Sequence, residues 1–155
     1  SHRGVELSLA GQPAQGLSVV AGAVFLDAEV SGEAVDLGSI GSRPVGTTGR
    51  MVRANFDYRL PFLNPVSVDL GITHQGAQVA SVLDYAELGG RQLTTEPQTL
   101  FDIGARYRFE VGGKPTTLRA QITNLFDTYR WKVGSNSSFR FIDERRFLLS
   151  LAADI

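Results

Sequence analysis

The sequence predicts an all-β fold, an antiparallel meander of about seven strands. Three observations lead to it: apolar and polar residues alternate along most of the chain, the prolines fall between the alternating stretches, and no stretch keeps a helical period. A period of two places successive side chains on opposite faces of a strand, so each stretch has one apolar and one polar face. The expected strands are residues 3–10, 17–30, 51–60, 66–79, 99–110, 116–126 and 145–155.

The alternation is clearest in residues 51–60, where the even positions are apolar or aromatic and the odd ones are mostly charged or amide residues. Residues 99–110 also alternate, but here the apolar and aromatic residues are at the odd positions. Because proline cannot donate to a strand ladder, its placement in the predicted gaps favours these strands. The prolines are Pro13, Pro44, Pro61, Pro65, Pro97 and Pro115.

The predicted connections alternate between short and long. In a meander, successive connections lie at opposite ends, so all short turns share one end and all long loops share the other. Outer-membrane barrels show this asymmetry, with short periplasmic turns and long extracellular loops. A soluble barrel can show it too, with its apolar residues turned inward. The short connections are 11–16, 61–65 and 111–115, and the long ones are 31–50, 80–98 and 127–144.

Hydropathy excludes a helical membrane protein but leaves a membrane barrel open. The longest apolar stretch, residues 17–26, is shorter than the ~20 residues a transmembrane helix needs, yet matches the roughly 9–11 of a tilted strand. Tyr58, Tyr107 and Phe109 lie near predicted short-turn ends, where an aromatic girdle at the membrane surface would sit.

Charge and composition exclude several kinds of site. The formal net charge is −1, which argues against a general nucleic-acid binder. The chain has no cysteine, and only His2 and His74 offer imidazole groups, so we expect no disulfide, no metal site and no cysteine nucleophile. His74 falls on the apolar side of its strand, and we expect it to be packed or interfacial rather than catalytic.

Two further motifs have simple structural interpretations. Gly112-Gly113-Lys114-Pro115 resembles part of a phosphate loop, but the proline and the lack of a following helix indicate a tight turn. Asp143 and Glu144 beside two arginines indicate a solvated loop cluster. Residues 136–138 match a glycosylation sequon that would be inert in a bacterium. We therefore predict no catalytic residue and no cofactor.

The C-terminal part of the chain resembles the last two strands of TonB-dependent outer-membrane receptors. The resemblance rests on Asn124-Leu125-Phe126-Asp127, on the Tyr129 that follows, and on the alternating stretch 144–155. Residues 40–46 are similar to a loop motif of the siderophore-receptor branch. The chain departs from the family pattern at its last residue, which is Ile155 where the family usually has phenylalanine.

The resemblance implies a barrel of about 22 strands around a plug, of which residues 1–155 would be the C-terminal part, without the plug and the early strands. It implies a receptor in the bacterial outer membrane that contacts lipid and takes up iron–siderophore complexes with the TonB system. The alternative left open is a small soluble β-barrel that binds an apolar ligand. Because strands 3–10 and 145–155 would lack neighbours in the isolated chain, we also predict a homodimer joined through these edges.

Two groups of residues are candidates for a binding role. Arginines on the polar faces would line the lumen, where they either guide an anionic ligand or, as we favour, pair with carboxylates of the wall or the plug, here Asp57, Asp69 or Asp102. Aromatic and cationic residues of the long loops suit capture of an iron chelate by stacking and charge. The lumen candidates are Arg53, Arg59, Arg106, Arg108 and Arg119, and the ligand candidates are Tyr85, Arg91, Tyr129, Trp131 and Phe139.

Overall fold

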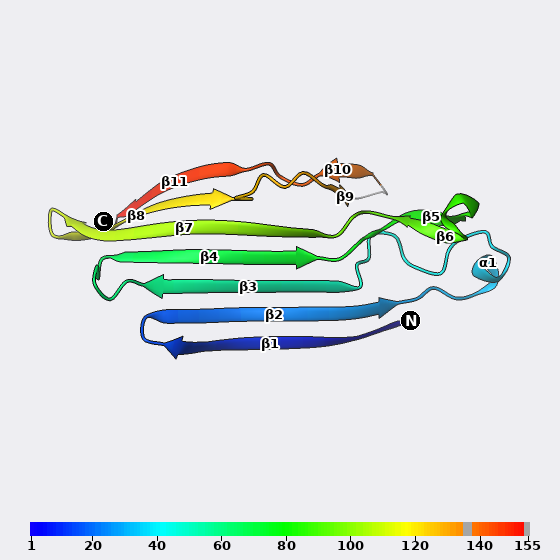
Figure 1. The fold of residues 1–155 in the computed structure, drawn as a ribbon, viewed down its shortest axis with the longest axis horizontal. Coiled ribbons are helices and arrows are strands. Elements are labelled where there is room, and N and C mark those ends of the chain that lie inside the picture. Colours follow the sequence, from blue (N-terminus) through cyan, green and yellow to red (C-terminus); the bar gives the residue numbers. More distant parts are fainter. Residues whose placement is uncertain (135–137, 154–155) are drawn as a thin grey trace.

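The computed structural model describes residues 1–134 and 138–153, and its main feature is an open antiparallel sheet of seven strands (Figure 1). The strands of this sheet lie side by side in the same order in which they occur along the chain, which confirms the predicted meander. No helix in the described residues is long and apolar enough to cross a membrane. In spatial order the strands are β1 (His2–Ala14), β2 (Leu17–Ala28), β3 (Arg50–Arg59), β4 (Val66–Gln75), β7 (Gln98–Val111), β8 (Lys114–Thr123) and β11 (Arg146–Ala153).

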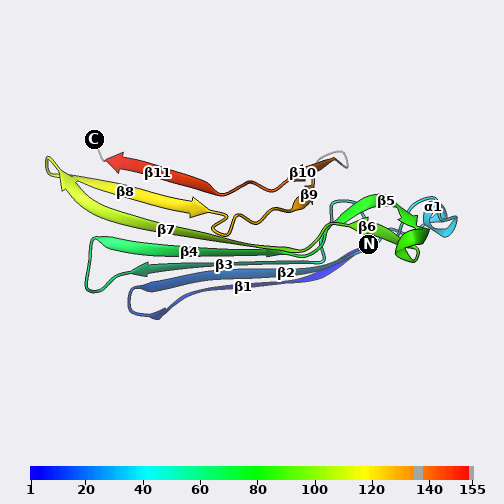
Figure 2. The ribbon, with the colours of Figure 1, turned by 45° about the horizontal axis from the view of Figure 1, so that its top comes forward.

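The long loops carry small elements of their own, all at the end of the sheet opposite the short turns (Figures 1 and 2). The separation of short turns from long loops is therefore confirmed. The first loop contains helix α1 (Glu33–Asp36). The second contains β5 (Val79–Tyr85), the 3-10 helix η1 (Ala86–Leu88) and β6 (Arg91–Thr94), and the third contains β9 (Trp131–Val133) and β10 (Phe139–Phe141).

Three predicted strand limits need correction. The strand expected over 66–79 ends at Gln75, and Val79 begins β5 of a separate two-stranded sheet. The strand expected over 116–126 ends at Thr123, because Asn124 turns the chain with a φ of 50°. The first connection is only two residues long, since β1 continues to Ala14. Of the predicted last strand, residues 154–155 lie outside the described part, as do residues 136 and 137 of the sequon.

Two prolines lie inside strands rather than in the gaps. Pro13 lies in the edge strand β1, where the register shifts between Gly11 and Ala14, so no regular ladder needs its N–H. Pro115 is the second residue of β8 and lies one residue beyond the last pair that the described residues form between β8 and β11. A strand accepts proline at both positions, so apolar and polar residues can alternate on either side of it without loss of the strand.

The strand register sorts the side chains of the sheet into two faces. One row across the sheet is apolar, and the next row, on the opposite face, is mostly polar. The apolar row is Val19, Phe56, Leu70, Ile103, Ile122 and Phe147, and the next row is Ser18, Asp57, Asp69, Gly104, Gln121 and Leu148.

Nothing in the described residues covers the apolar face. Phe147 and Leu149 are each 74% exposed, and the buried apolar residues, Ala28, Val79, Ala80 and Ile142, lie at the loop end. A soluble closed barrel would instead bury such a face in its interior. The sheet is open, with β1 and β11 at its two edges, so the interpretation as a small closed barrel does not fit. Pairing of two copies through these edges stays a prediction.

Candidate ligand site at the long-loop end

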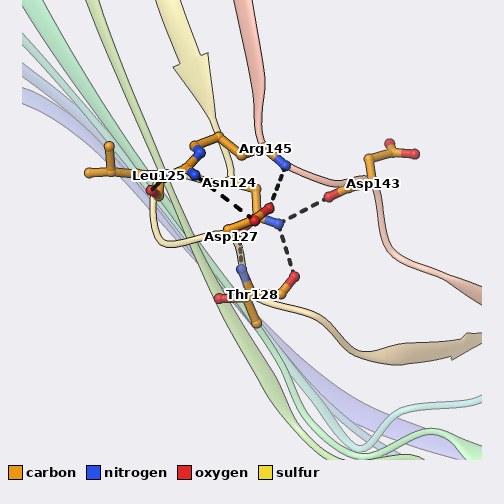
Figure 3. A network of polar contacts seen from close by, with 6 residues as sticks. All are labelled: Asn124, Leu125, Asp127, Thr128, Asp143 and Arg145. Carbon is orange, nitrogen blue, oxygen red and sulfur yellow. Dashed lines mark hydrogen bonds and ion pairs between the residues drawn. The ribbon is translucent and has the colours of Figure 1, made fainter.

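The Asn-Leu-Phe-Asp motif forms the turn by which the third long loop leaves the sheet (Figure 3). Asn124 and Asp127 both have positive φ, 50° and 52°, in a region that asparagine and aspartate enter more readily than most other residues. Asn124 is 4% exposed. Its Nδ2 donates to the carbonyls of Thr128 (2.9 Å) and Asp143 (3.0 Å), and its Oδ1 accepts from the Thr128 N–H (2.8 Å). The side chain thus ties the start of the loop to its end.

The neighbouring residues fix the same turn to the wall. The N–H of Arg145 donates to Asp127 Oδ1 at 2.9 Å, so the returning chain is held beside the departing one. The N–H of Asn124 donates to Asp102 Oδ1 at 2.8 Å. Of the three carboxylates offered as partners for the lumen arginines, Asp102 forms no ion pair in the described chain and accepts from this backbone N–H.

The hairpin β9–β10 gathers aromatic side chains at the tip of the third loop. The ring of Trp131 lies 3.6 Å, centroid to centroid, from that of Phe141, and the ring of Tyr129 stacks on Phe141 at 4.1 Å. Trp131 and Phe139 meet edge to face at 6.4 Å. Three of the five ligand candidates are therefore brought together. Phe141 was not among them, although its two-residue spacing from Phe139 could have indicated it.

A groove of about 630 Å³ separates this aromatic cluster from the second long loop. Residues 93–96 form one side, and Tyr129, Trp131 and Phe139 are on the other. An ion pair between Arg130 Nε and Glu96 Oε2, at 3.0 Å, joins the two loops. The groove therefore combines flat aromatic surfaces with charge, which suits a ligand having both apolar and ionic parts.

The other two ligand candidates lie in the β5–β6 hairpin. Tyr85 and Arg91 are directly opposite each other across this hairpin. Arg91 lines a second hollow, of about 790 Å³, which shares Leu93 and Thr94 with the groove. Tyr85 is 43% exposed and is not a lining residue of either hollow. The five candidates thus form two groups on neighbouring hairpins rather than one site.

On the polar face of the sheet, four charged side chains form a cluster. Arg106 pairs with Asp57 and lies 3.9 Å from Asp69, and Arg119 lies 3.5 Å from Asp69. The register places the two aspartates directly opposite each other, and likewise the two arginines. Like charges directly opposite repel, so the attractive contacts join residues that are not register partners. The pairing of Arg106 and Arg119 with wall carboxylates is as predicted.

The remaining lumen candidates, Arg53, Arg59 and Arg108, lie on the same face by register. Within residues 1–134 and 138–153 they form no ion pair. Their cationic groups are therefore available to a solute or to another part of the protein on this side of the sheet. That this side faces a lumen stays a prediction.

Two of the structural interpretations of motifs are confirmed. His74 lies on the apolar face opposite Val52, and its Nδ1 is 2.9 Å from Thr99 Oγ1, which makes it a packed, hydrogen-bonded residue. Gly112 and Gly113 form the two-residue turn between β7 and β8. Their φ angles of 59° and 76° are those of the mirror-image turn favoured in hairpins.

The open sheet, its uncovered apolar face and its loop-built end together define a wall segment of a membrane β-barrel. No family model matches the chain. Over 155 residues it is 28% identical to the ferrichrome receptor FcuA of Yersinia enterocolitica, covering 99% of this chain and 19% of that protein.

Solved structures show the same fold. BauA, the ferric preacinetobactin receptor of Acinetobacter baumannii, matches with a TM-score of 0.83 and 24% identity over 99% of this chain and 22% of its own. The ferripyoverdine receptor of the outer membrane of Pseudomonas aeruginosa, bound to ferripyoverdine, matches with a TM-score of 0.73 and 21% identity over 97% of this chain and 19% of its own. The chain therefore spans about a fifth of the length of these relatives. The resemblance to TonB-dependent siderophore receptors of the outer membrane is confirmed.

Proposed function

We propose that this chain is the C-terminal barrel segment of an outer-membrane receptor that takes up iron–siderophore complexes with the TonB system. The observation that carries the proposal is an amphipathic barrel wall that bears an aromatic groove at its long-loop end. The receptors to which the chain is similar are named for ferrichrome, ferric preacinetobactin and ferripyoverdine, which are all iron complexes. All three relatives are named as receptors, which favours transport over catalysis.

In the proposed receptor, the two faces of the sheet have different surroundings. The apolar face, with Leu7, Phe147 and Leu149, contacts outer-membrane lipid, because only an apolar medium stabilises so much exposed apolar surface. The polar face lines the lumen, as in other membrane barrels. There Arg106 and Arg119 hold strands together, while Arg53, Arg59 and Arg108 act on an anionic solute or on the plug.

At the long-loop end, the groove would receive the iron complex first. Tyr129, Trp131 and Phe139 offer rings for stacking against the chelating groups. Arg130, beside the groove, and Arg91, in the neighbouring hollow, offer positive charge for an anionic chelate. Capture by several weak contacts on loops would suit a ligand that must later be released into the lumen.

The test uses the full-length receptor, expressed in a Gram-negative strain that makes no siderophore and lacks its own ferric receptors. Ferrichrome, ferric preacinetobactin and ferripyoverdine are supplied separately with radioactive iron. We expect uptake of at least one complex, lost when the TonB system is deleted. Trp131 is 49% exposed, so a bound ligand would cover its ring, and Trp131→Ala should raise the half-saturating concentration about tenfold, as for an aromatic anchor of a binding site.

Phe62 provides the matched control, since it is an aromatic residue 81% exposed in a short turn at the other end of the sheet. Phe62→Ala should leave the half-saturating concentration unchanged. Failure to take up any of the three complexes would contradict the proposed transport. Equal half-saturating concentrations for Trp131→Ala and Phe62→Ala would contradict the proposal that the groove binds the iron complex.

A further inference from the structure

Gln78, between β4 and β5, connects to all three long loops. Its main-chain N–H donates to Thr95 Oγ1 at 3.1 Å, and the N–H of Thr95 donates to the Gln78 carbonyl at 2.9 Å. Gln78 also forms an isolated antiparallel bridge with Thr48. Its backbone is thus held by the first long loop, through Thr48, and by the second, through Thr95.

The carboxamide of Gln78 extends these connections to the third loop. Its Nε2 donates to the carbonyl of Gly46 at 3.3 Å, in the first loop. Its Oε1 accepts from the N–H of Val133 at 3.1 Å, in β9 of the third loop. Val133 is two residues from Trp131 on the same short strand, so this hydrogen bond holds the strand that carries one of the aromatic residues of the groove.

The first two loops form one unit without this carboxamide. Gln92, 9% exposed, donates through Nε2 to the carbonyls of Arg43 and Ser81, both at 2.8 Å, and accepts from the Arg43 N–H at 2.9 Å. Gly41 packs so closely on the Gln92 side chain that a Cβ at this position would overlap it. The second loop, with residues 93–96 of the groove, is therefore fixed to the first.

The third loop needs external support to keep its place. Strands β9 and β10 have three residues each and pair only with one another among the described strands, and an isolated two-stranded hairpin is marginal in water. The ion pair between Arg130 and Glu96 joins exposed side chains, 44% and 74% accessible, and such pairs contribute little. The hydrogen bond from Val133 to Gln78 is partly buried and better placed to hold the hairpin.

We propose that Gln78 is a positioning residue, which holds the β9–β10 hairpin at the separation from residues 93–96 that forms the groove. This inference rests on the proposed function of the groove as the site of the iron complex. When only a fraction of the molecules has the groove formed, the apparent dissociation constant rises in inverse proportion to that fraction. Gln78 thus sets affinity without touching the ligand.

The experiment compares Gln78→Met, Gln78→Glu and Gln98→Met in the full-length receptor. Methionine keeps the length of the side chain but removes both of its hydrogen bonds, while glutamate keeps an acceptor for the Val133 N–H. Gln98 is the matched control, because it lies at the same end of the sheet and, among the residues that the structure describes, its Nε2 bonds only to Gln75 Oε1, at 3.1 Å. Each variant is purified and also expressed in the uptake strain.

Two measurements are made on each variant. The first is the distance distribution between spin labels on Lys132→Cys in β9 and Leu88→Cys in η1, with any cysteine elsewhere in the receptor replaced. The second is uptake of whichever of the three ferric complexes the receptor transports. We expect Gln78→Met to broaden the distances and to raise the half-saturating concentration about fivefold to tenfold, as for one lost net hydrogen bond. The maximal uptake rate should not change.

Gln78→Glu should lie between Gln78→Met and the wild type, and Gln98→Met should match the wild type in both measurements. An unchanged distance distribution in Gln78→Met overturns the inference. An unchanged half-saturating concentration also overturns it, provided that Trp131→Ala raises that concentration. A fall in maximal uptake rate alone would indicate a general folding defect and overturn it as well. If Trp131→Ala has no effect, the proposed function of the groove fails, and the distances alone then decide whether Gln78 joins the loops.

Discussion

The wall of strands and the loop-built end are stabilised in different ways. The wall consists of continuous backbone ladders, in which the side chains alternate between an apolar and a polar face. The loop end depends on individual amide side chains, Gln78, Gln92 and Asn124, that bond to backbone groups of distant segments. We therefore expect the stability of the wall to depend on whether a residue is polar or apolar. The stability of the loop end should depend on which particular residue is present.

The largest effect should come from reversing polarity in the wall. Ile103 lies on the apolar face between Leu70 and Ile122. Ile103→Arg places a charge in lipid, which costs roughly 2–4 kcal/mol near the middle of the membrane. Asn55→Arg on the polar face should be mild. Both are measured as the free energy of unfolding of the full-length receptor in lipid vesicles.

Three further substitutions extend this test. Val52→Arg and Phe56→Arg should behave like Ile103→Arg, and Thr73→Lys should behave like Asn55→Arg. If both faces respond equally, the assignment of the faces is wrong.

A smaller but still large effect is expected where one side chain holds the third loop. Asn124→Ala removes three hydrogen bonds from a buried side chain and places alanine at a φ of 50°. We expect a loss of about 1–3 kcal/mol in unfolding free energy. Asn55→Ala is the control, because this asparagine makes no side-chain hydrogen bond within the described chain. A loss at Asn124 no greater than at Asn55 would show that polarity alone suffices at the loop end too.

The smallest effect is expected from a substitution that tests whether one particular residue is required within the wall. Gly104 lies opposite Asp69, and a Cβ at residue 104 would be 2.5 Å from Asp69 Oδ2. Gly104→Ala should move this carboxylate away from Arg106 and Arg119 and cost about 1–2 kcal/mol, as for an overpacked site. At Gly71, on the same face, a Cβ would be no closer than 3.5 Å to other atoms, so Gly71→Ala is the control. Equal unfolding free energies for the two variants would contradict the importance of the cluster.

This contrast explains what could be predicted from the sequence. The wall was predictable because period-two alternation directly encodes the faces of a strand. The aromatic cluster was partly predictable, since Tyr129, Trp131 and Phe139 belong to one loop. The roles of Gln78 and Gln92 were not predictable, because they depend on backbone groups more than ten residues away in the chain. The role of Asp102 was not predictable for the same reason: of the three carboxylates offered as partners for the arginines, this one accepts from the backbone N–H of Asn124, just after the end of β8.

The central claim is that one face of this sheet contacts lipid and the other faces water. It is tested most directly by single spin labels at residues 101–109 of β7, in the full-length receptor reconstituted in lipid vesicles. Collision with oxygen, which concentrates in lipid, should be high at the odd positions and low at the even ones, and collision with a water-soluble nickel chelate should show the opposite phase. A reversed phase, or no period of two, would contradict the account.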